Sequence, residues 1–209
     1  MTIEISLALP EQAESIAVLH VNSLPEDFLP SLGRDFLARQ YYPAALASPN
    51  AVTLVATEGT LPIGFATVAS DSDAFSRDVL RGRLWSIAGY ALRRALRQPG
   101  HLLLSLHVLL SALYPRPCPW PGEIVFIAVA EEFRGRGVGR RLIQAAVDQL
   151  AQSSVARCRT KTLVRNHDVI RIYTSLGWGV ADRYWLIGRE YVVLLSPGRR
   201  LDGVEAISC

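Results

Sequence analysis

Cysteine is scarce in this sequence, and the few cysteines lack the spacing of a metal or disulfide site. Only Cys118, Cys158 and Cys209 occur among 209 residues, and none of them forms a CxxC pair or stands near a histidine at metal-ligand spacing. Scattered, unpaired thiols are typical of proteins in a reducing compartment. The sequence therefore predicts no metal site, no disulfide framework and a cytoplasmic location.

Long apolar runs are also missing. No stretch reaches the roughly 18 apolar residues of a spanning helix, and the longest run, HLLLSLHVLLSALY, is interrupted by His107 and two serines. The first residues, MTIEISLALPEQ, place acidic residues before any apolar run, unlike a signal peptide. The net charge of +3 is too small to indicate nucleic-acid binding. We therefore expect neither a membrane span nor a nucleic-acid partner.

The remaining composition is that of a globular enzyme-sized domain. Half of the residues are hydrophobic and a fifth are charged, which is typical of a chain with a substantial core. A length of 209 residues suits one domain with an insertion. We expect residues 1–195 to form this domain, residues 71–120 to be the insertion, and the polar residues 196–209 to be a flexible tail.

The segment before the insertion alternates strand and helix patterns. Residues 2–7 read as a strand, and a helix is expected to begin near Pro10. A second helix is expected over about 31–47, broken or kinked near Pro43. The runs AVTLVATEG and PIGFATVAS are rich in β-branched residues and predict a hairpin.

The insertion has a composition of its own. An apolar stripe predicts one helix, through Leu80, Leu84, Ile87, Ala91 and Ala95. PGHLLLSLHVLLSALY predicts a second helix, and PRPCPWPG an extended connection. Between Arg77 and Arg116 there are seven arginines and one acid, Asp78. Three interpretations stay open: the arginines bind an anionic acceptor, the helices over 78–114 lie on a membrane or a second subunit of a homodimer, or they form a hairpin packed on their own domain.

After the prolines the chain follows a βαβα order and ends in two strands. The expected elements are a strand over 123–130, a helix over 137–152, a strand over 159–165, a helix over 167–176, and strands over 183–187 and 190–195 that turn at Gly188-Arg189.

The stretch FRGRGVGRRL links the first of these strands to its helix. Backbone N–H groups of such a turn, together with the helix dipole, favour a bound phosphate, and glycine lets the backbone come close. A Walker A loop would need a Lys-Ser/Thr pair that is absent, and a Rossmann fingerprint would need glycine where Arg140 stands. The remaining alternatives are another phosphate loop or a tight turn with incidental arginines.

A second motif, RNHDVIRIYTSLGW, follows one strand later. Asn166 stands where a helix N-cap is expected, and Tyr173 lies seven residues, or about two turns, further along the same side. Together with Arg134-x-x-Gly137-x-Gly139, this pair resembles the two coenzyme A motifs of the GNAT superfamily of N-acetyltransferases. Two mild departures are Val169 for the usual alanine and Trp178 for the usual phenylalanine.

The resemblance covers residues 121–195 well and residues 1–70 weakly. It implies an α/β fold whose central sheet is mixed, mostly antiparallel and flanked by helices, with the insertion between the third and fourth strands. It also implies direct transfer of an acetyl group from acetyl-CoA to a primary amine, without a covalent enzyme intermediate. The residues that it assigns to the cofactor are Ile127, Ala128, Val129, Arg134, Gly135, Arg136, Gly137, Val138, Gly139, Arg140, Asn166 and Tyr173.

Within that set, three groups receive roles. The resemblance implies that the Val129 N–H polarises the thioester carbonyl and that Tyr173 protonates the leaving thiolate. Asn166 either contacts the cofactor or simply caps its helix. A cofactor-binding module without catalytic activity, and a nucleotide-binding protein that uses the same loop, are the rival interpretations.

The acceptor amine needs a proton acceptor, because an alkyl amine with a pKa near about 10 is protonated at neutral pH. Glu123 is the candidate base, since some acetyltransferases of this superfamily carry a glutamate at the start of the same strand. Strand alternation is expected to place Glu123, Val125, Ile127 and Val129 on one face. The alternative is a solvated glutamate at a strand start. The identity of the acceptor is not encoded in any motif of the chain.

Overall fold

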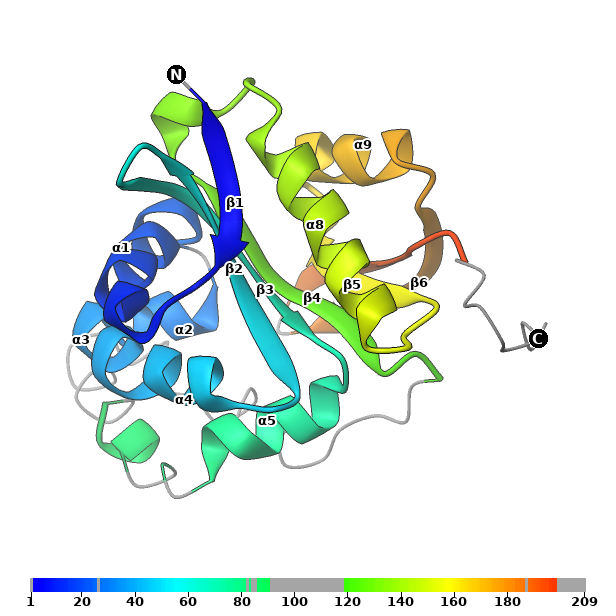
Figure 1. The fold of residues 1–209 in the computed structure, drawn as a ribbon. Coiled ribbons are helices and arrows are strands. Elements are labelled where there is room, and N and C mark those ends of the chain that lie inside the picture. Colours follow the sequence, from blue (N-terminus) through cyan, green and yellow to red (C-terminus); the bar gives the residue numbers. More distant parts are fainter. Residues whose placement is uncertain are drawn as a thin grey trace.

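A computed structural model describes residues 2–25, 27–81, 83, 86–90, 119–186 and 188–198. They form a seven-stranded sheet with the strand order β1-β2-β3-β4-β5-β7-β6 (Figure 1). Only β4 and β5 pair in parallel, and every other neighbouring pair is antiparallel. The strands are β1 Ile3–Leu7, β2 Ala51–Glu58, β3 Leu61–Ala69, β4 Gly122–Val129, β5 Cys158–Leu163, β6 Gly179–Leu186 and β7 Arg189–Leu195. The predicted fold class is confirmed.

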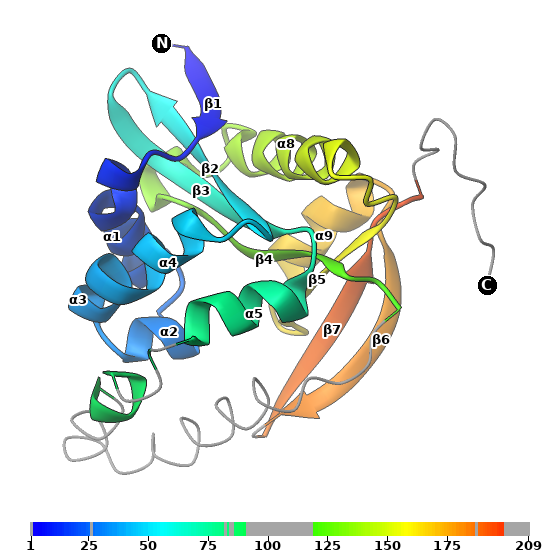
Figure 2. The same cartoon turned by 60° about the horizontal axis from the view of Figure 1, so that its bottom comes forward.

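Helices cover both faces of the sheet. Figures 1 and 2 show α1 to α5 on one face, here called the α1 face, and α8 and α9 on the other, the α8 face. A separate hydrophobic cluster fills each interface. The helical segments are η1 Pro10–Gln12, α1 Ala13–Ser23, α2 Phe28–Ser31, α3 Arg34–Phe36, η2 Leu37–Tyr41, α4 Tyr42–Ala47, α5 Ser72–Leu80, η3 Glu131–Phe133, α8 Val138–Gln152 and α9 His167–Ser175.

The helix expected over about 31–47 is broken at a different residue. The break falls at Gly33, whose φ of 97° lies in the left-handed region that favours glycine. Pro43 instead stands in the first turn of α4, where its missing N–H costs little. The segment just before it, η2, is a π-helix, whose wider turn leads the chain into α4 without a break. The irregularity expected near Pro43 is present as this π-helix, which ends directly before α4, and the full break lies further upstream at Gly33.

The insertion begins with α5, which the apolar stripe did not predict. The Asp71 side chain caps this helix by accepting from the N–H groups of Asp73 (3.0 Å) and Ala74 (2.9 Å). The helix ends where Arg81 turns to an extended ψ of 121°, so the helix predicted through Leu80 does not run on unbroken. Residues 86–90 are again helical. The second predicted helix and most of the arginines lie outside the described residues, which contain no helix long and apolar enough to cross a membrane.

Strand β4 contains a one-residue bulge. Thr67 of β3 pairs with Phe126, and Val68 pairs with Ile124, so Val125 has no partner of its own. A bulge reverses the alternation of side chains beyond it. Val125 therefore packs in the cluster on the α1 face, whereas Ile127 and Val129 pack in the cluster on the α8 face. The expectation that alternation keeps Glu123, Val125, Ile127 and Val129 on one face is wrong.

The flexible tail was predicted to begin at residue 196, but Ser196 is fixed to the domain by hydrogen bonds. Ser196 is buried, its N–H donates to the Cys158 carbonyl, and its hydroxyl accepts from the Cys158 N–H, both at 2.9 Å. The predicted tail beyond residue 198 lies outside the described residues. Cys158 is itself 2 % exposed, as expected of a small core residue.

Candidate functional site

Strands β4 and β5 separate after a short stretch of pairing. The last of their three paired positions is Ile124 with Thr160, although β4 runs on to Val129. The Ala130 N–H donates across to the Ile63 carbonyl of the β3 side at 2.8 Å. Because successive N–H groups point to opposite edges of a strand, the N–H groups of Val129 and Ile127 point to the side of β5. This opened edge can pair with an extended ligand that carries amide groups.

The glycine loop leads from this edge into α8. Gly135 and Gly137 have φ angles of 76° and 77°, so both positions use a conformation that other residues rarely adopt. The first backbone bond of the helix runs from the Arg141 N–H to the Gly137 carbonyl (3.1 Å). The preceding N–H groups, of residues 138–140, have no partner within the helix and lie at its positive end. The loop therefore has the geometry of a phosphate site.

The arginines of the loop make contacts within the chain, which the sequence pattern does not reveal. These contacts run from Arg134 Nε to the Val129 carbonyl (3.2 Å), from the Arg136 guanidinium to the Phe133 ring (4.9 Å), and from Arg140 Nη2 to the Ser175 carbonyl (3.3 Å). The first contact fixes the loop to the end of β4, and the last joins the start of α8 to the end of α9. The arginines thus shape the loop, and its backbone N–H groups are the candidate anion-binding groups.

Tyr173 of α9 lies beside the point where the two strands separate. Its side chain is 1 % exposed, and its ring packs edge to face on Trp178 at 4.7 Å. Its hydroxyl makes no hydrogen bond within the described residues, although it lies near Thr160, whose own hydroxyl donates to the Ile124 carbonyl (3.0 Å). Burial raises the pKa of Tyr173 above its usual value. A buried hydroxyl without a partner is costly, and a ligand atom at the separation point would satisfy it.

Asn166 does not act as a capping side chain. Although it occupies the N-cap position of α9, its side chain makes no cap hydrogen bond. Its amide Nδ2 instead donates to the Thr162 hydroxyl of β5 at 3.0 Å, and the residue is exposed. The capping alternative is therefore wrong, and the amide stays on the strand side of the helix, where a ligand between β4 and β5 can reach it.

Glu123 is buried in a charged cluster rather than solvated. Its carboxylate accepts from Arg159 Nε at 2.8 Å and from Lys161 Nζ at 3.0 Å, and Arg159 also donates to the Ser72 hydroxyl at 2.9 Å. Burial pushes the pKa of the Glu123 carboxyl upward, but the charges and hydrogen bonds of Lys161 and Arg159 outweigh it, so the pKa lies below its usual value. The solvated alternative is wrong, and the carboxylate is a weaker proton acceptor than an ordinary glutamate.

Arg159 and Lys161 were not among the site residues predicted from the sequence. They occupy alternate positions of CRTKTL, so both point to the same face of β5. The strand is expected to lie in the interior of the sheet, and buried charges are usually paired. Two cations on one face of such a strand therefore indicate a buried acid nearby. That signal was present, but the partner, Glu123, lies 36 positions away.

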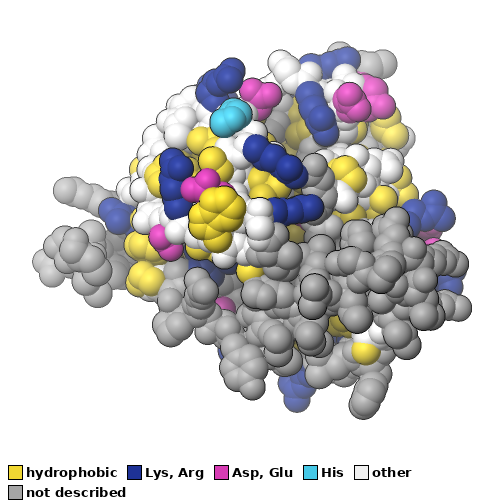
Figure 3. Space-filling model, turned by 180° about the vertical axis from the view of Figure 1, so that it is seen from behind, with side chains coloured by type: hydrophobic (Ala, Val, Ile, Leu, Met, Phe, Trp, Pro, Cys, Tyr) yellow, Lys and Arg dark blue, Asp and Glu magenta, His cyan; other side chains and the backbone are white. Residues whose placement is uncertain are grey.

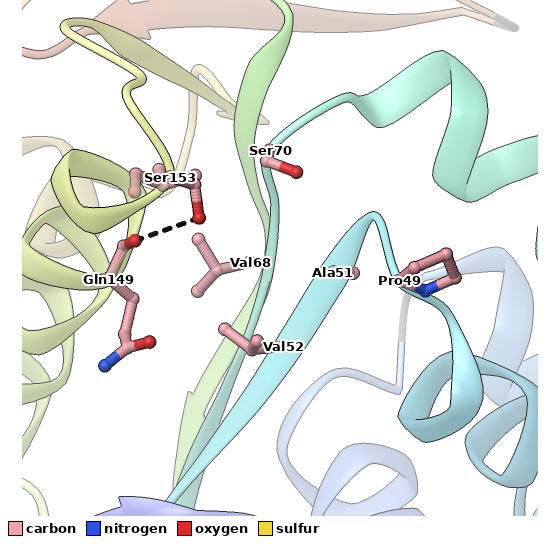
Figure 4. A pocket seen from close by; sticks show the side chains of 8 residues that line it. Pro49, Ala51, Val52, Val68, Ser70, Gln149 and Ser153 are labelled. Atoms are coloured by element: carbon pink, nitrogen blue, oxygen red, sulfur yellow. Dashed lines mark hydrogen bonds between the residues drawn. The ribbon is translucent and has the colours of Figure 1, made fainter.

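A small pocket lies away from this site, at the C-terminal end of α8 (Figure 4). Its lining is Pro49, Ala51, Val52, Val68, Ser70, Gln149, Leu150 and Ser153. The Ser153 hydroxyl is already bonded to the Gln149 carbonyl at 3.3 Å. This lining holds no charged side chain and does not belong to the opened edge of β4. Within the described ranges, no group of His, Cys, Asp and Glu could hold a metal ion.

Comparison with known proteins agrees with the resemblance seen in the two sequence motifs. Residues 107–178 match the model of the acetyltransferase (GNAT) family, a range that includes both motifs. No curated protein sequence matches the chain. The match to the family model and the fold agree with the resemblance seen in the two motifs.

Solved structures match the chain over nearly all of its length. The ribosomal-protein-S18-alanine N-acetyltransferase of Escherichia coli has a TM-score of 0.59 at 13% identity, covering 98% of this chain and 99% of that one. The structure of yncA from Salmonella typhimurium with its cofactor acetyl-CoA has a TM-score of 0.60 at 14% identity, covering 100% and 99%. A GNAT acetyltransferase of Streptococcus pneumoniae gives 0.58 at 17% identity, covering 93% and 98%. At these identities, the structures show a shared fold.

Proposed function

Because the chain is a GNAT-type acyltransferase that uses acetyl-CoA as its donor, we propose that it transfers the acetyl group directly to a primary amine. One observation carries the proposal: the unpartnered hydroxyl of Tyr173 lies where β4 and β5 separate, next to a strand edge that leads to a phosphate loop. These features form one continuous path along the edge of β4, suited to a long ligand with a phosphate end and a reactive end.

The backbone of the loop and strand holds the donor. The N–H groups at the start of α8 bind the pyrophosphate, and the edge around Ile127 pairs with the pantetheine amides. The Val129 N–H donates to the carbonyl oxygen that gains negative charge during attack. Acetyl-CoA supplies the activated acetyl group.

Tyr173 is suited to donate a proton rather than to accept one. Its raised pKa keeps the hydroxyl protonated throughout the neutral range. Among the residues that the structure describes, the hydroxyl makes no hydrogen bond. We therefore assign it the protonation of the departing sulfur, the role that the sequence motif implies.

Glu123, the candidate base of the sequence, suits a different role. A carboxylate whose pKa lies below its usual value has little tendency to take a proton from an alkyl ammonium group. We propose that Glu123 holds Lys161 and Arg159 in place, and that the acceptor amine loses its proton to solvent. The value of kcat/KM should then rise with pH toward the pKa of the amine.

Two measurements test the function. Calorimetry should show that acetyl-CoA binds the protein and that ATP does not, since the rival nucleotide-binding function predicts the reverse. A thiol reagent should then detect coenzyme A release that depends on added amine. Binding without amine-dependent release across a broad amine panel would favour the non-catalytic binding module.

A further inference from the structure

The α1 face of the sheet carries a row of polar side chains just beyond the point where β4 and β5 separate. Lys161 contacts Glu123, which sets the face to which Lys161 points. In the register of β5 and β7, Lys161 pairs with Val193 and Leu163 pairs with Tyr191. Directly opposed residues share a face, and so do residues two apart along a strand. Tyr191 therefore lies on the same face as Lys161, two residues further from the separation point.

An aromatic pair and further charges extend this row. The rings of Tyr191 and Tyr184 stack at 5.4 Å with 10° between their planes. The guanidinium of Arg189 reaches the Tyr191 hydroxyl, and Arg165 and Asp27 lie close enough to influence its charge state. Figure 3 shows several Lys and Arg side chains gathered on the back of the molecule beside hydrophobic ones.

The balance of charge along the row is positive. On this face Lys161, Arg165, Arg189 and buried Arg159 stand against Asp27, Glu123 and Asp182, the last of which pairs with Val193, so the cations exceed the acids by one. Lys161 has 37% of its side chain exposed, so its ammonium can also reach a ligand. Cations that gather around an aromatic surface suit an anion, above all a planar or branched one such as a carboxylate or phosphate.

Strand geometry sets the span of such a ligand. At about 3.3 Å per residue, the position of Tyr191 lies roughly 7 Å beyond that of Lys161, and the position of Arg189 roughly 13 Å beyond it. An amine held beside Lys161 would therefore carry its anionic group about 7–13 Å away along the strand.

We propose that this row, Lys161, Tyr191 and Arg189, binds the acceptor and that the acceptor is an amine carrying a carboxylate or phosphate group. The proposal rests on the proposed acetyl transfer, because it takes the donor to occupy the opened edge of β4. The proposal defines the class of acceptor as amines that carry an anionic group at a distance from the nitrogen. The motifs on the donor side do not define this class.

Matched pairs of amines test the class directly. The probes are 4-aminobutyl phosphate against 4-aminobutanol, and triglycine against triglycine amide. Their binding to the protein loaded with coenzyme A is measured by calorimetry, and their acetylation by coenzyme A release from acetyl-CoA. We expect at least one anionic probe to bind about tenfold tighter than its neutral partner, and the better pair identifies phosphate or carboxylate as the preferred group.

Variants of Lys161 and Arg189 test whether these side chains cause the preference for the anionic probes. Arg189→Gln and Lys161→Met should each reduce the anionic preference at least threefold, and Arg189→Lys should retain part of it. Arg183→Gln is the matched control, because Arg183 pairs with Val192 on the opposite face and has 59% of its side chain exposed. It should leave the preference unchanged.

Two results would overturn the proposal: no anionic probe binds better than its neutral partner, or the preference survives both Arg189→Gln and Lys161→Met. Either result leaves the donor function standing if acetyl-CoA still binds and is turned over. A third result is distinct from these two: if the unmodified protein does not bind acetyl-CoA, the proposed function itself is contradicted.

Discussion

The proposed donor side and the proposed acceptor side of this molecule are built in different ways. On the donor side, the strand edge, the glycine loop and the starts of two helices follow one another along the chain and act largely through backbone groups. On the acceptor side, side chains from distant segments meet: Arg159 bonds Glu123 across 36 positions and Ser72 across 87. A site built from local backbone geometry leaves a motif in the sequence, whereas a site built from long-range side-chain contacts leaves none.

The largest effect is expected on the acceptor side, from Glu123→Gln. Loss of this carboxylate leaves buried Arg159 without its counter-ion, which should lower the free energy of unfolding by about 3 kcal/mol in urea denaturation. Glu190→Gln is the control, since the 3.7 Å pair of Glu190 with Arg183 is partly exposed and should contribute under about 1 kcal/mol. Equal losses in the two variants would contradict the structural role of the cluster.

The same cluster predicts how stability depends on pH. The folded-state pKa of Glu123 lies below its unfolded value near 4.5, so its contribution is complete above that pH and is lost as the pH falls through the folded value. The stability difference between the unmodified protein and Glu123→Gln should therefore narrow below about pH 4.5. A difference that stays constant down to pH 3 on the urea curves would speak against this ion pair.

On the donor side, Tyr173→Phe should separate catalysis from stability. Loss of the proton donor should lower kcat about 100-fold, with little change in acetyl-CoA affinity. The apo protein should become more stable by about 1 kcal/mol, because an unpartnered buried hydroxyl has been removed. If unfolding instead shows a loss of stability, the hydroxyl has a partner within the protein, and the assignment to the donor sulfur fails.

A smaller effect is expected from Gly137→Ala. The φ of 77° at this position disfavours any other residue by about 1–2 kcal/mol, so the loop should shift and weaken acetyl-CoA binding about tenfold. Gly179→Ala is the control, since Gly179 has no positive φ and open space where a Cβ would lie. Calorimetric titration of both variants would show whether loop conformation limits donor affinity.

The smallest effect is expected from Arg140→Gln. This arginine donates to the Ser175 carbonyl at an exposed position, so its loss should change acetyl-CoA affinity less than threefold at physiological salt. A loss of tenfold or more, increasing at low salt, would mean that the side chain binds phosphate directly, and the donor side would then depend on side chains as the acceptor side does.

Much of the fold was predictable because its patterns are local. The strand and helix that flank the glycine loop, the hairpin of β2 and β3, and the turn at Gly188 lie within a few residues of the predicted positions. The turn glycines and apolar periods that define them depend only on neighbouring residues.

The predictions that were wrong concern features that depend on contacts between residues far apart in the sequence. The bulge at Val125 is fixed by pairing with β3, and no residue type marks it in the sequence. The burial of Glu123 depends on partners from β5 and α5. The break at Gly33 was hidden because a glycine and a proline competed as helix breakers, and the chain accommodates the proline with a π-helical turn that ends directly before α4.

The bulge makes Val125 the residue of β4 that the register with β3 does not use. Replacing Val125 by another apolar residue alters a single half-buried contact. Deleting Val125 would remove the extra residue and leave Phe126 opposite Thr67 and Ile124 opposite Val68 as neighbouring regular pairs, so Glu123 would stay on the α1 face with Arg159. A mutational scan would then score position 125 as tolerant both to apolar substitution and to loss of a single codon.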